Sequence, residues 1–216
     1  MLKIILYIVA AAAAYLAGGL NPAIIISKAV YGRDIRKCGS GNPGFTNFKR
    51  VFGNKWAWWV LVFDLAKSAV VAAIFAWLIS AAGGNYRIAA AWIGLFAVVG
   101  HAYPLWYGFK GGKGFLVYLS VVWFTDWRSG LVAVLVMLIL LGITRYMSLS
   151  TVLAMLSCPI TLIVTGAAWQ TVILCTITVL FIAWRHRENF IRLKNGEESR
   201  FSLKGKGSAE SAKRNG

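Results

Sequence analysis

Acidic residues are scarce in this sequence: its 216 residues include 7 Asp and Glu against 23 Lys and Arg, for a formal net charge of +16. In a soluble protein such an excess would suggest nucleic acid as a partner. However, 59% of the residues are hydrophobic, only 14% are charged, and the mean hydropathy is +0.67. This composition indicates a membrane-embedded chain, in which basic residues gather in the loops on one side of the membrane. We therefore predict that membrane lipids surround the protein and that it has no nucleic-acid partner.

Cysteine and histidine are rarer still. The cysteines are odd in number; Cys158 and Cys175 fall in apolar runs, and Cys38 lies in a basic loop. No disulfide framework is implied. No cluster of His, Cys or carboxylate residues has the spacing of metal ligands, so we predict no metal site and no cofactor.

Long apolar runs, in contrast, are abundant, and about 20 apolar residues can cross a bilayer as a helix. The first run begins like a signal peptide but continues through NPAIIISKAV without a clear cleavage site, so we expect a retained helix. The run at 113–126 is short: at about 1.5 Å per residue it reaches roughly 20 Å, which requires a thinned bilayer or a re-entrant helix. The predicted spans lie near 2–28, 55–81, 86–107, 113–126, 128–145, 147–166 and 169–185.

The basic residues between these spans predict the orientation. Only Lys3, Arg87 and Arg128 fall on one side, whereas the other loops and the end of the chain carry nearly all the rest. Positive loops face the cytoplasm. The sequence thus predicts an all-α integral membrane protein with about seven transmembrane helices, the amino terminus outside and the carboxyl terminus cytoplasmic. We expect one membrane domain at 1–201 and a basic tail with a disordered composition at 202–216.

Three polar clusters interrupt the apolar chain, all on the predicted cytoplasmic side. The first, GSGNPGFTNFKR, runs from Gly39 to Arg50. Its glycines let backbone N–H groups turn toward an anion, and Arg50 has the planar fork that fits phosphate oxygens. Its other candidates are Gly41 and the neutral polar residues Ser40, Asn42, Thr46 and Asn47. A turn-rich connecting loop is the alternative interpretation.

The second cluster, GHAYPLWYGFKGGKG, runs from Gly100 to Gly114. It is not a nucleotide P-loop, because that motif needs a glycine at the position of Tyr107 and a Ser or Thr at Gly114. A glycine hinge with lysines at the start of a helix is nevertheless a good anion site. Its candidates are Lys110, Gly111, Gly112, Lys113 and Gly114. A turn with two snorkelling lysines is the alternative.

The third cluster, HRENFIRLKNGEE, follows the last span. On a helix, His186 and Asn189 would share one face, which could point at a polar substrate. An ordinary basic juxtamembrane segment is the alternative.

Together the clusters resemble the three motifs of the bacterial glycerol-3-phosphate acyltransferase family that uses acyl phosphate as donor, often called PlsY. The resemblance covers roughly residues 1–201 and keeps the motifs in order. It implies seven transmembrane helices in the bacterial inner membrane, with the active site on the cytoplasmic side. The implied reaction moves a fatty acyl group from acyl phosphate to the sn-1 hydroxyl of glycerol 3-phosphate, the first step of phospholipid synthesis. The enzyme that makes acyl phosphate is a possible partner.

The resemblance implies roles for Ser40, Arg50, Gly111, Gly112, Lys113, His186 and Asn189, and the chemistry of the clusters adds the other candidates. The catalytic candidates are Ser40, Lys113, His186 and Asn189. The expected substrate-binding residues are Gly41, Asn42, Thr46, Asn47, Arg50, Lys110, Gly111, Gly112 and Gly114.

Two other functions are less well supported by the residues. A transporter for phosphorylated solutes would place its site at the midplane between repeats, and no repeat is visible. An acyl-CoA or acyl-carrier-protein transferase with a His and an Asp four residues later is not indicated, because Leu105 and Phe190 stand at the positions four residues after His101 and His186.

Asp64 and Lys67 lie inside a predicted span and are either functional residues or a structural ion pair. We expect His101 to be a hydrogen-bonded packing residue.

Overall fold

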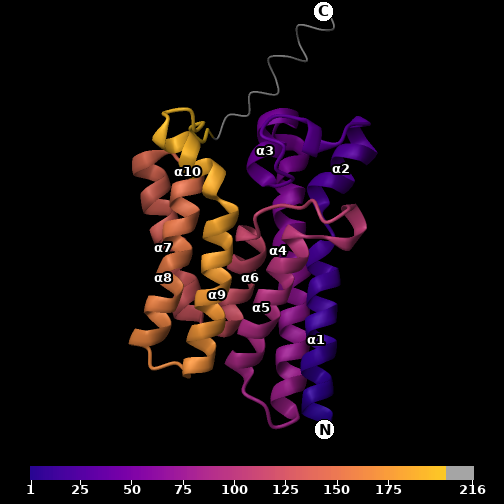
Figure 1. The fold of residues 1–216 in the computed structure, drawn as a ribbon, viewed down its shortest axis with the longest axis vertical. Helices are drawn as coiled ribbons and strands as arrows, with labels where there is room; N and C mark the ends of the chain where they lie inside the picture. The colour runs from indigo at the N-terminus through magenta and orange to yellow at the C-terminus, as the bar shows by residue number, and fades with distance from the viewer. Residues whose placement is uncertain (203–216) are drawn as a thin grey trace, which may run out of the picture.

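A computed structural model describes residues 1–202 as a bundle of helices, so the all-α prediction is confirmed for that part of the chain. The predicted tail at 202–216 lies outside the described residues, apart from Ser202. In Figure 1 the amino terminus is at one end of the bundle, and the short helices α2, α3 and α10 are at the other. The helices are α1 (Leu2–Gly19), α2 (Pro22–Tyr31), α3 (Phe45–Phe52), α4 (Asn54–Ala81), α5 (Tyr86–Ala102), α6 (Phe115–Thr125), α7 (Trp127–Thr144), α8 (Met147–Val164), α9 (Trp169–Arg185) and α10 (Arg187–Lys194), with 3-10 turns at Ile35–Lys37 and Leu105–Tyr107.

Five segments of the described chain are long and apolar enough to cross a membrane. Two shorter apolar helices, α6 and α9, occupy the remaining predicted positions, so the count of seven crossings stays a prediction. Many large apolar side chains, such as Trp77 and Val164, are exposed on the outside of the bundle, where lipid would cover them. The five segments are Leu2–Tyr31, Asn54–Ala81, Tyr86–Tyr107, Trp127–Thr144 and Met147–Val164.

The single helix predicted for 2–28 is wrong in detail, because α1 ends at Gly19 and a second helix, α2, begins at Pro22. Pro22 has no N–H to continue the hydrogen-bond ladder. The Asn21 side chain accepts a 3.0 Å hydrogen bond from the Ile24 N–H and so begins α2. The same side chain donates to the Pro43 carbonyl at 3.0 Å. The break therefore fixes the loop that precedes α3.

Close packing of α1 on α5 depends on two glycines. A methyl group at Gly18 would overlap the Ala97 carbonyl, and one at Gly100 would overlap the Tyr15 carbonyl. Small residues at such contacts let helix backbones approach in lipid, where no hydrophobic force drives them together. This contact holds the end of α5 from which the second polar cluster starts.

The short helix α6 is fixed at the end away from that cluster. There the Arg87 guanidinium pairs with the Asp126 carboxylate and donates to the Thr125 carbonyl at 2.9 Å. Asp126 also caps α7 by accepting from the Arg128 N–H at 2.8 Å. The interactions at Asp126 therefore anchor an 11-residue helix that is shorter than a bilayer crossing.

The orientation can be tested with reporter fusions. The turn between α4 and α5, at 82–85, lies at the opposite end of the bundle from α10 (Figure 1). We expect a reporter fused after Arg200 to be cytoplasmic and one inserted near Asn85 to be external, since basic loops stay inside. A cytoplasmic reporter at Asn85 would contradict the seven-span arrangement.

Candidate active site

The three polar clusters, far apart in the sequence, meet at one cavity of about 360 Å³. This size is within the range of small-molecule sites. Polar residues of all three clusters line it, together with others from α4, α8 and the segment after α10. The polar lining consists of Ser40, Asn42, Thr46, Asn47, Arg50, Asp64, His101, Lys113, Ser148, Thr151, His186, Asn189, Arg192, Glu198 and Ser199, and Gly44 and Gly114 contribute backbone.

The loop of the first cluster is held in shape by Asn47. Its side-chain oxygen accepts from the Ser40 N–H at 2.9 Å, and its amide donates to the Cys38 carbonyl at 3.0 Å. Asn47 is almost fully buried and lines the cavity. The turn also needs Gly39 and Gly41, which have φ of 58° and 72°. These contacts place Ser40 at the cavity wall.

Arg50 lies in the last turn of α3 and lines the same cavity. Its guanidinium makes no hydrogen bond or ion pair with residues 1–202. A forked cation without a protein partner in a pocket is available to bind an anion.

Lys113 and Asn189 connect the second cluster to the third. The Lys113 ammonium donates to the Asn189 side-chain oxygen. The Asn189 amide donates to Glu198 Oε1 at 2.7 Å, and the Ser148 hydroxyl donates to the same oxygen at 2.7 Å. Burial and, to a smaller extent, the nearby Arg192 charge lower the pKa of Lys113 to about 8. Lys113 is therefore a cation that can lose its proton close to physiological pH.

Glu198 organises this side of the cavity, and sequence analysis missed it together with Ser148 and Arg192. Arg192 Nε donates to Glu198 Oε2 at 3.0 Å. Burial alone would raise the pKa of Glu198, but the hydrogen bonds from Asn189, Ser148 and Arg192 together hold it below its usual value. Glu198 could have been singled out from the sequence, because it is one of only 7 acidic residues and lies in a basic cluster.

His186 lies at the junction of α9 and α10, and its exposed fraction is 5%. Its Nδ1 is 2.8 Å from the Ile182 carbonyl, which can only accept, so Nδ1 carries the proton and Nε2 is the acceptor. Burial and, to a smaller extent, the nearby Lys113 charge lower its pKa to about 4. The imidazole is thus neutral at cytoplasmic pH.

Arg185, which precedes it, was also missed by sequence analysis. Its Nη2 donates to the Gly112 carbonyl at 3.0 Å and to the Gly111 carbonyl at 3.3 Å. With those carbonyls turned toward Arg185, the glycine loop is held against the end of α9.

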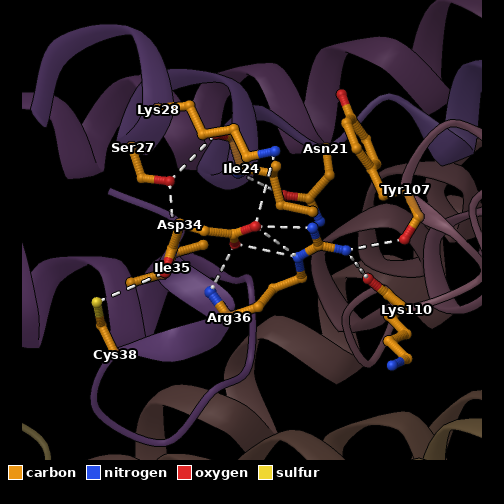
Figure 2. A network of polar contacts seen from close by, with 10 residues as sticks. All are labelled: Asn21, Ile24, Ser27, Lys28, Asp34, Ile35, Arg36, Cys38, Tyr107 and Lys110. Atoms are coloured by element: carbon orange, nitrogen blue, oxygen red, sulfur yellow. Dashed lines mark hydrogen bonds and ion pairs between the residues drawn. The ribbon is translucent and has the colours of Figure 1, made fainter. Parts of the chain in front are cut away.

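A second connection, through Arg36, joins the segment before the first cluster to the second cluster (Figure 2). Arg36 Nη1 donates to the Tyr107 carbonyl at 2.8 Å, and its Nε and Nη2 bind Asp34 at 3.0 and 2.7 Å. The hydrogen bonds from Arg36 hold the pKa of Asp34 at about 2. Both Asp34 and Arg36 were overlooked in the sequence.

The remaining predicted residues lie elsewhere. Gly41, Lys110 and Gly111 line a separate hollow beside Asp34 and Arg36, and Gly112 lines neither space. Their substrate-binding role stays a prediction. Among residues 1–202 no group of three or more His, Cys, Asp or Glu side chains could hold a metal ion.

Apolar side chains from α4, α6 and α7 also line the cavity, so cationic groups and hydrocarbon share one space. Such a site suits an amphiphile with an anionic head. The apolar lining includes Leu61, Phe115, Leu116, Met137, Leu138 and Leu141.

Comparison with known proteins gives a consistent answer. A family model described as glycerol-3-phosphate acyltransferase matches residues 8–196. A protein of that name from Agrobacterium fabrum (strain C58 / ATCC 33970) is 40% identical over 198 residues, covering 91% of this chain and 92% of that protein. One from Coxiella burnetii (strain RSA 493 / Nine Mile phase I) is 34% identical over 197 residues, covering 91% of this chain and 99% of that protein.

Two solved structures of an integral membrane glycerol 3-phosphate acyltransferase have a similar fold. The crystal structure of PlsY (YgiH), an integral membrane glycerol 3-phosphate acyltransferase, in its glycerol 3-phosphate form superposes with a TM-score of 0.82 at 34% identity, covering 94% of this chain and 96% of that one. Its lysphosphatidic acid form gives a TM-score of 0.78 at 33% identity, covering 91% and 95%. Family, fold and length of the match coincide, and this chain is therefore a multi-pass membrane protein that belongs to the glycerol-3-phosphate acyltransferase family.

Proposed function

We propose that this protein transfers a fatty acyl group from acyl phosphate to the sn-1 hydroxyl of glycerol 3-phosphate, giving 1-acylglycerol 3-phosphate and inorganic phosphate as the first step of phospholipid synthesis. The observation that carries the proposal is the cavity itself, which is lined both by Ser40, Arg50 and Lys113 and by apolar side chains. A fatty acyl phosphate likewise combines an anionic head with a hydrocarbon tail. The reaction would take place at the cytoplasmic face of the bacterial inner membrane, supplied by the enzyme that makes acyl phosphate.

The donor would lie with its chain along α7 and its phosphate near Lys113 and Ser40. The Lys113 ammonium and the glycine loop stabilise negative charge on the phosphate as it leaves. Glycerol 3-phosphate would be held by Arg50, His186 and Asn189, which place its hydroxyl at the carbonyl carbon. The predicted roles of Asn42, Thr46 and Gly114, which also line the cavity, are to contact the two phosphate groups.

The acyl group would pass directly from acyl phosphate to glycerol 3-phosphate, without an acyl-enzyme intermediate. The hydroxyl oxygen forms the new ester bond, the bond from the carbonyl carbon to the phosphate oxygen breaks, and the hydroxyl proton passes to the departing phosphate. His186 is a weak base for this step, because its pKa is about 4. A phosphate group with a second pKa near 6 is a better acceptor. His186 Nε2 would instead accept a hydrogen bond from the hydroxyl and orient it.

Donor choice tests the proposal. Purified protein is supplied with glycerol 3-phosphate and either acyl phosphate or acyl-CoA, with lysophosphatidate as the readout. We expect turnover with acyl phosphate only, because acyl-CoA has no phosphate attached to its acyl carbonyl for Lys113 to bind. Comparable rates with both donors would refute the assignment of the donor.

The pH dependence of kcat/KM for acyl phosphate follows from Lys113. The protonated form is the cation, and its pKa is about 8, so kcat/KM should fall as pH rises through that value. His186, with a pKa of about 4, should add no titration between about pH 5 and 8.

The matched control is Lys113→Arg, which keeps a cation far above pH 8. Whatever its absolute rate, its profile should lack the alkaline fall. An identical fall in both proteins would show that another group titrates.

A further inference from the structure

His101 is a buried side chain of the cavity that the proposed mechanism does not use. It lies at the end of α5, its exposed fraction is 4%, and it lines the cavity together with Asp64 and Lys113. The sequence predicted that His101 is a hydrogen-bonded packing residue. Its hydrogen bonds indicate a more specific role.

The Lys67 ammonium has three acceptors around it. It lies 2.8 Å from Asp64 Oδ1, 2.7 Å from the Leu20 carbonyl and 3.1 Å from His101 Nδ1. A lysine ammonium carries only N–H donors and no lone pair, so it cannot accept a hydrogen bond from any of these groups. The Leu20 carbonyl is available because the helix breaks before Pro22.

This arrangement fixes the tautomer of His101. Since Lys67 can only donate, Nδ1 must be the nitrogen with the lone pair, and the proton of the neutral ring is on Nε2. Asp64 does not compete for Nδ1, because its Oδ1 is 3.7 Å away, beyond hydrogen-bond distance. The tautomer of His101 is therefore opposite to that of His186.

The protonated nitrogen lies beside the glycine loop. A methyl group added to Gly112 would overlap His101 Nε2, so the loop backbone lies directly against the ring. The Gly112 N–H donates to the His101 carbonyl at 3.0 Å, and the Gly111 N–H donates to the Ala102 carbonyl at 3.1 Å. His101 Nε2 forms no hydrogen bond with residues 1–202.

We infer that His101 donates its Nε2–H to a phosphate oxygen of the acyl phosphate, and that Lys67 and Asp64 are positioning residues that fix its tautomer. This inference rests on the proposed function. A neutral donor beside Lys113 adds a hydrogen bond to the anion without adding charge to a buried site.

The tautomer can be measured without any substrate. The chain contains only two histidines, so 15N-histidine labelling of the full protein, purified without a histidine tag, gives two imidazole ring systems. His186→Gln assigns the signals. At pH 7.5 we expect His101 to be protonated on Nε2 and unprotonated on Nδ1. An Nδ1-protonated or doubly protonated His101 would overturn the inference.

Ligand contact is tested by adding an acyl phosphonate, which cannot be hydrolysed at the phosphorus–carbon bond. The His101 Nε2 resonance should shift as the phosphonate saturates the donor site, shown by competitive inhibition against acyl phosphate. Saturation without any shift would refute the contact. Absence of turnover with acyl phosphate in the unmodified protein would instead refute the proposed donor, and the tautomer result would still stand.

Steady-state kinetics distinguishes a hydrogen bond from His101 to acyl phosphate from a purely structural role of this residue. His101→Leu removes the donor and should lower kcat/KM for acyl phosphate about 10- to 100-fold, the usual effect of one hydrogen bond to a charged group. His101→Gln keeps an N–H near the same place and should restore most of the loss. The KM for glycerol 3-phosphate should not change. Equal effects of both variants on both substrates would indicate a structural residue.

The positioning residues are tested as a pair, because removing Lys67 alone would leave Asp64 buried without a partner. The double variant Asp64→Leu/Lys67→Met should show mixed tautomers of His101 and a lower kcat/KM for acyl phosphate. A double variant with a single Nε2-protonated tautomer and unchanged kcat/KM would overturn the positioning role.

Discussion

Lys113→Met is expected to lower kcat/KM for acyl phosphate by about two to three decades. The substitution removes the cation of the glycine loop while keeping the apolar stem of similar length. A charge-assisted hydrogen bond is worth about 1.5 to 3 kcal/mol, and a donor aimed at developing charge contributes about 10²- to 10³-fold. The Asn189 side-chain oxygen would also lose its donor, which adds to the effect.

Steady-state kinetics with varied acyl phosphate measures the loss. Lys55→Ala is the matched control, because Lys55 is an exposed lysine at the start of α4 and lines neither cavity. It should behave like the unmodified protein. Unchanged kinetics in Lys113→Met would contradict the anion site at the second cluster.

Arg50→Ala is expected to raise the KM for glycerol 3-phosphate and to lower kcat/KM for it by about one to two decades. Arg50 has no partner among the described residues, so its removal leaves no buried protein group unpaired. The loss should therefore appear in substrate use and not in stability. Thermal unfolding in detergent provides the second measurement.

Arg50→Lys distinguishes charge from geometry. It keeps a cation but loses the planar fork, so it should recover only part of the activity. A large fall in melting temperature without a specific change in KM would contradict the role of Arg50 as a phosphate ligand.

The sequence alone determined the class of the protein. Apolar runs of bilayer length leave no other fold than helices in lipid, since every backbone polar group must then be satisfied within its own segment. The three glycine-rich or basic clusters were recognisable because polar residues are costly inside an apolar chain and stand out against it. Arg50, Lys113, His186 and Asn189 were found in this way, and all four line one cavity.

Only the tertiary structure decided how these residues act together. The tautomer of His186 depends on a carbonyl one turn earlier, and that of His101 depends on Lys67, which is 34 positions away in the sequence. Glu198 and Ser148 bind each other across 50 positions, and Arg36 reaches Tyr107 across 71. Sequence periodicity reports only local geometry, whereas the pKa of a buried group and the partner of a hydrogen bond depend on which segments the fold brings together.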